Sequence, residues 1–328
     1  MRIAVVGAGA IGAYAGAALV RGGADVVLIA RGAHLAAMQT RGVEVRSPRG
    51  DFRAHPEATD ELAAIEEADV VFITLKAYSL PELMPRLVRH LSPEATVVAG
   101  QNGIPWWYFE SHGGPLDGRH LESVDPGGVI QAALGPGRTV GTVVYPAAEI
   151  VEPGVIQHVE GTRFTIGEPN RKPSERCRAI SEAFVAGGLK CPIEEDLRGQ
   201  IWLKLLGNAS FNPVSALTRA TLGELGETSE MVDALRAMME EMAAVAEALD
   251  VGIPVGIERR LERGLAVGDH KTSMLQDIEA GKPLEYACMS GAVVELAELL
   301  GICAPYMTAV NAAVGALDDL SQRAASNS

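Results

Sequence analysis

A lysine and two asparagines, spaced at intervals of four residues, could carry out chemistry on a carbonyl group. Lys204, Asn208 and Asn212 would share one narrow stripe of a helix with about 3.6 residues per turn. Their neighbours are mostly apolar, and an unpaired buried polar group costs about 1–3 kcal/mol, so we interpret the stripe as a site rather than a solvated face. Pro213 predicts a bend or an end of the helix there. An ammonium group can stabilise a developing alkoxide and protonate it, a contribution of roughly 10²–10⁴-fold.

Two further polar residues follow in the same half of the chain. The segment 272–276 has the spacing of a capping box, with Ser273 as the N-cap and Gln276 at position N3. The residues 281–283, Gly-Lys-Pro, end that helix and start the next, which predicts Glu285 in a first helical turn, where the helix dipole favours an anion. On periodicity alone, both polar residues therefore have ordinary structural explanations.

The amino-terminal residues have the types and spacing needed to bind a dinucleotide. Residues 3–6 predict a buried strand, the run Gly7-Ala8-Gly9-Ala10-Ile11-Gly12 follows at once, and an Ala-rich helix comes next. Gly7 allows a tight turn, Gly9 leaves room for a pyrophosphate, and Gly12 lets helix and strand approach closely. The helix N-terminus, at Ala10 and Ile11, would offer backbone amides to the phosphates.

The residue after the second predicted strand indicates which dinucleotide binds. This strand, 25–30, ends without the acidic residue that would bond the ribose 2′-hydroxyl of NAD. Arg31 stands there instead, and a guanidinium can hold a 2′-phosphate in a forked, charge-assisted contact. The sequence therefore favours NADP over NAD, the alternative being that Arg31 is a solvated surface residue.

Polar residues also follow the next two predicted strands, 70–75 and 97–100. Lys76 and the turn Gln101-Asn102-Gly103 come directly after them. Ligands of parallel sheets collect at the carboxyl ends of the strands, so Lys76 and Asn102 are candidates to bind cofactor or substrate. The alternatives are an exposed lysine and an ordinary turn.

The order of predicted elements divides the chain into an α/β half and a helical half. Three more predicted strands, 140–145, 155–159 and 163–167, would complete a partly antiparallel sheet. After residue 192 the β-branched runs stop and helical periodicity takes over, as in 230–249 and 284–300. We predict a Rossmann-like, doubly wound nucleotide-binding domain over residues 1–195. An all-helical domain for substrate binding or dimerisation would cover 196–328, with the ligand in the cleft between the two.

Composition excludes several classes of protein. With 328 residues, 48% of them hydrophobic and 21% charged, the chain can bury a large core, and its net charge of −14 argues against nucleic-acid binding. The four widely spaced cysteines indicate neither a disulfide framework nor a zinc site. We expect a cytoplasmic protein that holds no metal and binds no membrane.

Taken together, these motifs resemble those of the ketopantoate reductase family, the NADPH-dependent 2-dehydropantoate 2-reductases of pantothenate biosynthesis. The resemblance runs from about residue 2 to 314 and is specific, because separated motifs occur in the family's order. These motifs are Gly7-Gly9-Gly12, Thr74-Leu75-Lys76, Gln101-Asn102-Gly103, Lys204-x-x-x-Asn208-x-x-x-Asn212-Pro213, and Ser273-Met274-Leu275-Gln276-Asp277 with Glu285 beyond.

The resemblance implies a role for each residue on the substrate side. Lys204 would be the general acid, and Glu285 would orient Lys204 or the substrate hydroxyl. Asn208 and Asn212 would hold polar groups of the substrate, and Ser273 would contact its carboxylate. The sequence leaves open whether burial, which lowers the pKa of a lysine, or the carboxylate of Glu285, which raises it, prevails.

On the cofactor side, the resemblance implies that Lys76 and Asn102 lie where the nicotinamide meets the substrate and that Arg31 binds the 2′-phosphate of NADPH. The chain departs from the family in the aromatic and Gly-rich stretch 106–128. Its four adjacent aromatics, 106–109, would pack under a long loop, form a wall for a bulkier 2-oxo acid, or be buried in a homodimer. The competing functions are a β-hydroxyacid or opine-type dehydrogenase and a regulator that binds NADP without turnover.

Overall fold

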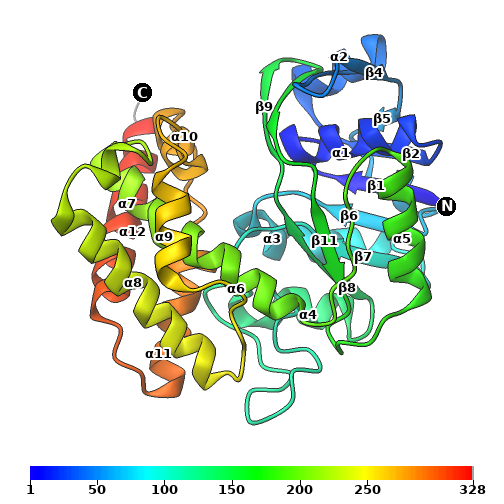
Figure 1. Cartoon of the computed structure of the whole chain (residues 1–328). Helices are drawn as coiled ribbons and strands as arrows, with labels where there is room; N and C mark the ends of the chain where they lie inside the picture. Colours follow the sequence, from blue (N-terminus) through cyan, green and yellow to red (C-terminus); the bar gives the residue numbers. More distant parts are fainter. Residues whose placement is uncertain (327–328) are drawn as a thin grey trace. The chain divides into compact units, whose positions relative to one another are not determined.

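The structure is a computed structural model that describes residues 1–326, and its contacts divide the chain into two compact units (Figure 1). The first unit comprises residues 1–101, 106–120 and 127–197. The second unit comprises the chain from Arg198 onward together with two earlier segments, 102–105 and 121–126. Short pieces of the α/β half of the sequence therefore fold as parts of the helical unit.

The first unit is built on a seven-stranded sheet whose strand order is β11-β8-β7-β6-β1-β2-β5. The neighbouring strands are parallel except for the antiparallel pair β8 and β11. This is the Rossmann-like, partly antiparallel sheet that the sequence predicted. Its strands are β1 (Arg2–Val6), β2 (Asp25–Ile29), β5 (Glu57–Thr59), β6 (Val70–Ile73), β7 (Thr96–Ala99), β8 (Thr139–Val144) and β11 (Phe164–Gly167).

A second sheet of the first unit has the order β4-β3-β10-β9. The prediction that the strand near 155–159 completes the main sheet is wrong, because β10 pairs with β9 and β3 instead. A strand's own pattern shows that one of its faces is buried and does not show which partner it pairs with. The strands of this sheet are β3 (Val43–Arg46), β4 (Phe52–Ala54), β9 (Ala147–Glu152) and β10 (Val155–Glu160).

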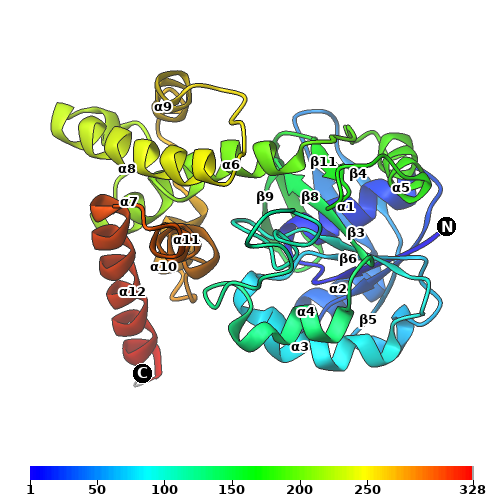
Figure 2. The same ribbon diagram turned by 90° about the horizontal axis from the view of Figure 1, so that it is seen from below.

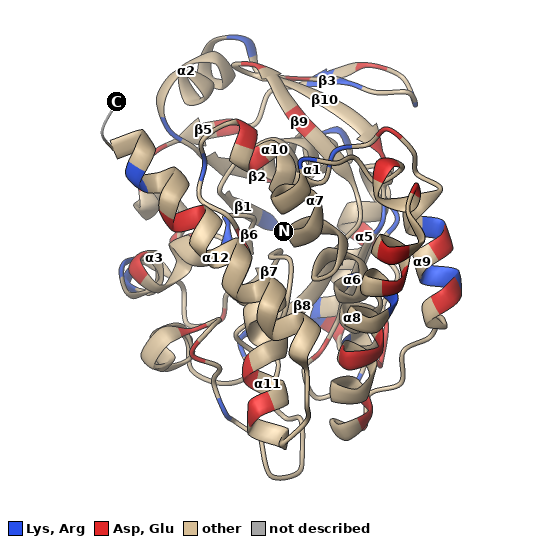
Figure 3. Ribbon diagram, turned by 90° about the vertical axis from the view of Figure 1, so that its left-hand side faces the viewer, with Lys and Arg blue, Asp and Glu red and all other residues tan. Residues whose placement is uncertain are grey.

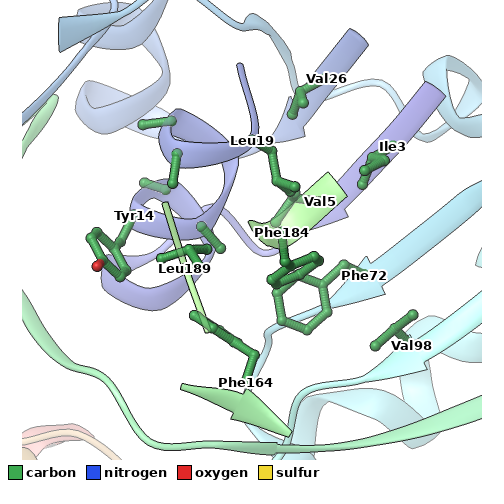
Figure 4. Close-up of a cluster of buried hydrophobic side chains, with 14 of the residues drawn as sticks. Ile3, Val5, Tyr14, Leu19, Val26, Phe72, Val98, Phe164, Phe184 and Leu189 are labelled. Atoms are coloured by element: carbon green, nitrogen blue, oxygen red, sulfur yellow. The ribbon is translucent and has the colours of Figure 1, made fainter. Parts of the chain in front are cut away.

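The core of the first unit lies between its sheets and helix α1 (Ala10–Arg21). Phe72, Phe164 and Phe184 meet there edge to face, with ring centroids 5.2–6.1 Å apart (Figure 4). Such aromatic pairs add about 0.5–1.5 kcal/mol each beyond the area that they bury. The other helices of the unit are α2 (Gly32–Arg41), α3 (Leu80–Leu87), α4 (Val129–Leu134) and α5 (Glu175–Ala186).

The four adjacent aromatics, 106–109, are buried as well. Each is at most 5% exposed, and the ring of Trp107 occupies the space that a Cβ at Gly141 would need, 2.2 Å from that position. Their burial agrees with packing within the fold, and the substrate wall and the homodimer stay predictions.

The second unit is helical, as predicted. Its helix α7 packs against α10 and α12 (Figure 2). The predicted helix 230–249 is present as α8 (Ser229–Ala248), whereas the predicted helix 284–300 begins as a π-turn, Ala287–Gly291, and continues as α11 (Ala292–Leu300). The remaining helices are α6 (Leu197–Asn208), α7 (Phe211–Thr218), α9 (Ile257–Leu265), α10 (Ser273–Glu279) and α12 (Pro305–Ser326).

Acidic side chains predominate on α8 and α11, in keeping with the net charge of −14 (Figure 3). Within residues 1–326, no helix has the length and apolarity needed to cross a membrane. In the same described residues, no group of three or more His, Cys, Asp or Glu side chains is arranged to hold a metal ion.

Candidate active site

The glycine loop of the first unit forms a cradle between β1 and α1. Gly7 has φ +100°, and a Cβ there would lie 2.6 Å from the side chain of Leu75. A Cβ at Gly12 would lie 2.5 Å from the carbonyl oxygen of Gly7 and from Oγ1 of Thr74. The Thr74 hydroxyl donates to that same carbonyl at 2.7 Å, which locks the turn. Thr74 was identified from the sequence only as part of a family motif. The structure gives it a structural role, which is to hold the carbonyl of Gly7.

The loop leaves open space where a phosphate would approach. A Cβ at Gly9 would meet nothing closer than 3.9 Å, and among residues 1–326 no N-cap side chain bonds the first turn of α1. The first-turn amides at Ala10 and Ile11 therefore lack a side-chain acceptor, as a dinucleotide site requires. The residues present fit the pyrophosphate of a nicotinamide dinucleotide.

Other predicted cofactor residues of the first unit lie beyond the ends of its strands. Arg31 is exposed at the N-terminus of α2, directly after β2. Lys76 is partly buried just past β6, at the start of a short 3₁₀ turn. Gln101, beyond β7, donates from Nε2 to the carbonyls of Ile73 (2.9 Å) and Leu75 (3.2 Å) and so ties the ends of β6 and β7 together.

Asn102 and Lys204 meet within the second unit, although 102 positions separate them in the chain. Nζ of Lys204, on α6, donates to Oδ1 of Asn102 at 2.7 Å, and both side chains are partly buried. The amide oxygen is the acceptor here, so it stabilises the charged ammonium. The structure thus brings together two residues that the sequence picked out separately.

Burial lowers the pKa of Lys204 from its ordinary 10.5 to about 8, while the negative charge of Glu285 opposes the shift. Burial therefore prevails in the competition that the sequence left open. Glu285 is itself 5% exposed, but it lies in the segment before the π-turn and not in a first helical turn. The predicted dipole contact is wrong, because the regular α-helical turns begin only at Ala292.

The stripe of Lys204, Asn208 and Asn212 is not a single helical face. Helix α6 ends at Asn208 and α7 begins at Phe211, so Asn212 belongs to the next helix, where it is 7% exposed. The bend that Pro213 predicted comes four residues earlier than the proline. Proline lacks the amide that would continue the ladder, and it is tolerated in the first turn of a helix, where the structure places it.

The cap of α10 is Thr272 and not Ser273. The Thr272 hydroxyl accepts from the amide of Leu275 at 3.2 Å, so the capping arrangement sits one residue earlier than predicted. Ser273 is the first residue of the helix, and its side chain is exposed. Threonine and serine are both common N-cap residues, so the sequence alone does not show which of the two neighbours caps the helix. The backbone conformation decides it.

The chain matches one family over both of its halves. Residues 3–108 match the family described as Ketopantoate reductase PanE/ApbA, and residues 196–318 match its C-terminal counterpart. A 2-dehydropantoate 2-reductase from Mesorhizobium japonicum is 44% identical, with 96% of this chain and 97% of that protein covered.

Solved structures show the same architecture. A putative ketopantoate reductase from Ralstonia solanacearum MolK2 is 34% identical, with 98% of each chain covered and a TM-score of 0.90. D-mandelate dehydrogenase, in a ternary structure with NADH and anilino(oxo)acetate, has a TM-score of 0.83 at 18% identity, covers 98% of this chain and 99% of its own, and shares the fold. With the nucleotide cradle, the ammonium site and these relatives together, the chain belongs to the ketopantoate reductase family of oxidoreductases, as its sequence predicted.

Proposed function

We propose that the protein reduces 2-dehydropantoate to pantoate with NADPH, and that Lys204 supplies the proton. The observation that carries this proposal is the partly buried ammonium of Lys204, bonded to Asn102 and lowered in pKa to about 8. A general acid works best with a pKa near the working pH, because it must hold a proton and also release it. A 44% identical relative named 2-dehydropantoate 2-reductase supports the substrate.

The cofactor would bind through its phosphates to the loop of Gly7, Gly9 and Gly12. When bound, the dihydronicotinamide supplies the hydride that reduces the carbonyl carbon. Arg31 is exposed beyond β2, and we propose that it pairs with the 2′-phosphate and so favours NADPH over NADH. Lys76 and Asn102 would orient the nicotinamide and the substrate.

On the substrate side, the second unit would hold a 2-oxo acid by its polar groups. Nζ of Lys204 would stabilise the developing alkoxide and then give it a proton. Asn208 and Asn212 would bond the polar groups of the substrate, and Ser273 would contact its carboxylate. The exposed, non-capping side chain of Ser273 supports that last role. Glu285 would keep Lys204 charged until the alkoxide forms, since its charge raises the pKa of that lysine.

A bulkier substrate would need an aromatic wall at residues 106–109 that faces the substrate. These rings are at most 5% exposed, which gives that alternative less support than ketopantoate has. Burial of the rings in a homodimer is not needed to explain them either, so the homodimer stays a prediction.

The decisive experiment follows NADPH oxidation with ketopantoate and with 2-oxo acids of increasing bulk. We expect ketopantoate to give the highest kcat/KM and the Lys204→Ala variant to lose at least two orders of magnitude in kcat while its affinity for NADPH is kept. Near-normal turnover of Lys204→Ala would refute the assignment. Oxidation of 3-hydroxy acids, or reduction that depends on an amine, would favour another dehydrogenase, and NADPH binding without any turnover would favour a regulator.

A further inference from the structure

The helical chain directly after Glu285, whose charge raises the pKa of the proposed proton donor, contains a local irregularity. In an α-helix each amide bonds the carbonyl four residues earlier, whereas the amide of Gly291 donates to Tyr286, five residues earlier, at 3.1 Å. This is the π-turn Ala287–Gly291. Such insertions are rare and occur frequently at functional sites.

The π-turn is joined to the segment that carries Asn102. The carbonyl of Cys288 accepts from the amide of Ile104 at 2.8 Å, a donor outside its own helix. The thiol of Cys288 also lies 3.5 Å from the carbonyl oxygen of Asn102. Both contacts lie within the second unit, to which residues 102–105 belong.

Gly103 allows this close approach. Its φ of +81° is in the left-handed region, and a Cβ there would lie 2.2 Å from the carbonyl oxygen of Cys288. Backbone atoms cannot move aside as a flexible side chain can, so any other residue at this position would push the segment off the π-turn.

The π-turn is itself anchored on both sides. The hydroxyl of Ser290, which is fully buried, donates to Oδ1 of Asn311 on α12 at 2.8 Å. The amide of Leu284 donates to Oδ1 of Asp318 on the same helix at 3.0 Å. Helix α12 thus holds the chain on both sides of Cys288, at Leu284 and at Ser290.

We propose that the π-turn positions the proton donor: the carbonyl of Cys288 and the missing side chain of Gly103 hold Asn102 so that its Oδ1 orients the ammonium of Lys204. Cys288 and Gly103 are positioning residues, since they act on Lys204 only through Asn102. This inference rests on the proposed role of Lys204.

The test measures the pKa of Lys204 in the protein without substrate, by competitive acylation of its amine at a series of pH values and mass spectrometry. A hydrogen bond to the charged form raises a pKa, so losing the Asn102 contact lowers it, by on the order of one unit. We expect this shift in Gly103→Ala and in Asn102→Ala, with a matching move of the alkaline limb of kcat/KM to lower pH.

A double-mutant cycle distinguishes positioning from general damage. If Gly103 acts through Asn102, Gly103→Ala produces no further shift in the Asn102→Ala background. Additive shifts, or a Lys204 pKa that Gly103→Ala leaves unchanged, would overturn the proposal. Gly301→Ala is the matched control, because Gly301 has a similar φ of +67° and its Cβ would meet nothing within 4 Å.

Two milder variants keep the test informative if Gly103→Ala does not fold. Cys288→Ala keeps the carbonyl and removes only the thiol, so we expect an unchanged pKa of Lys204. Ser290→Ala releases an anchor of the π-turn and should lower that pKa by a smaller amount; the reverse pattern would contradict a role for the carbonyl. These pKa readings do not depend on turnover, so they stand apart from the Lys204→Ala assay, which alone tests the proposed function.

Discussion

The kcat/KM for reduction should begin to fall near pH 8 as the pH is raised, because the proposed acid must be protonated to act. We call this fall the alkaline limb. Burial lowers the pKa of Lys204 from 10.5 to about 8. At roughly 1.4 kcal/mol per unit, this shift corresponds to about 3 kcal/mol against the charged form. Above pH 8 the protonated fraction falls tenfold per unit, so kcat/KM at pH 10 should be about one hundredth of its plateau. An unperturbed lysine would leave the rate nearly flat to pH 10.

The assay is NADPH oxidation at saturating cofactor from pH 6 to 10, compared between the wild type and two variants. Lys204→Arg keeps a cation that stays protonated throughout this range. The maximal rate of this variant should be lower, and its rate should no longer fall at alkaline pH. Glu285→Gln removes the charge that raises the pKa of Lys204, so its limb should move to lower pH. Two buried thiols should not titrate within this pH range, since burial raises the pKa of Cys177 to about 11 and that of Cys191 to about 12.

A limb that begins only above pH 10, or one that survives unchanged in Lys204→Arg, would refute the reasoning. The first result would mean that the ammonium is solvated during catalysis. The second would mean that another group titrates, and that Lys204 contributes charge without contributing the proton.

Three further predictions test separate parts of the structure. Lys204→Met should abolish turnover, and its free energy of unfolding relative to the wild type should fall as the pH rises from 8 to 10.5. The reason is that a lysine whose folded pKa lies below its unfolded pKa destabilises the wild-type fold fully below pH 8 and progressively less above it; denaturant titration at pH 7 and 10 measures the change. Arg31→Ala should weaken NADPH binding about tenfold or more and leave NADH binding unchanged, which fluorescence titration measures. Thr272→Ala should cost about 1 kcal/mol of stability through the lost cap, whereas Ser273→Ala should raise the KM for the substrate without a thermal shift.

The glycine loop between β1 and α1 was predictable from sequence because its determinants are local. The strand, the glycines and the first turn of α1 lie within about a dozen residues, so spacing alone shows where each glycine must sit. The structure adds what spacing cannot show, namely that Thr74 from a neighbouring strand end locks the carbonyl of Gly7. That contact joins residues 67 positions apart and depends on strand order.

The sequence singled out Lys204, Asn102 and Glu285, but it could not predict how these residues are arranged. Periodicity placed Asn212 on the helix of Lys204, but it could not locate the break after Asn208, which depends on how the chain satisfies its amides around Pro213. The assignment of residues 102–105 to the second unit also escaped prediction, because the turn after β7 is defined by contacts with Cys288 far along the chain. The same limit explains β10, whose pattern fits either sheet.

Two opposing effects act on the pKa of Lys204: burial lowers it, and the charge of Glu285 raises it. A pKa far to either side would impair a proton donor. A lysine buried without polar partners can fall to a pKa of about 5–6, where it carries no proton at neutral pH. A solvated lysine, at 10.5, holds its proton too tightly to pass it on readily. The charge of Glu285 opposes the effect of burial, and the pKa of Lys204 is about 8. Asn102 accepts a hydrogen bond from the ammonium and so also favours its charged form. Removing either partner should therefore lower the pKa of the acid, whereas opening the site to water should raise it. Variants of the two kinds should move the alkaline limb in opposite directions.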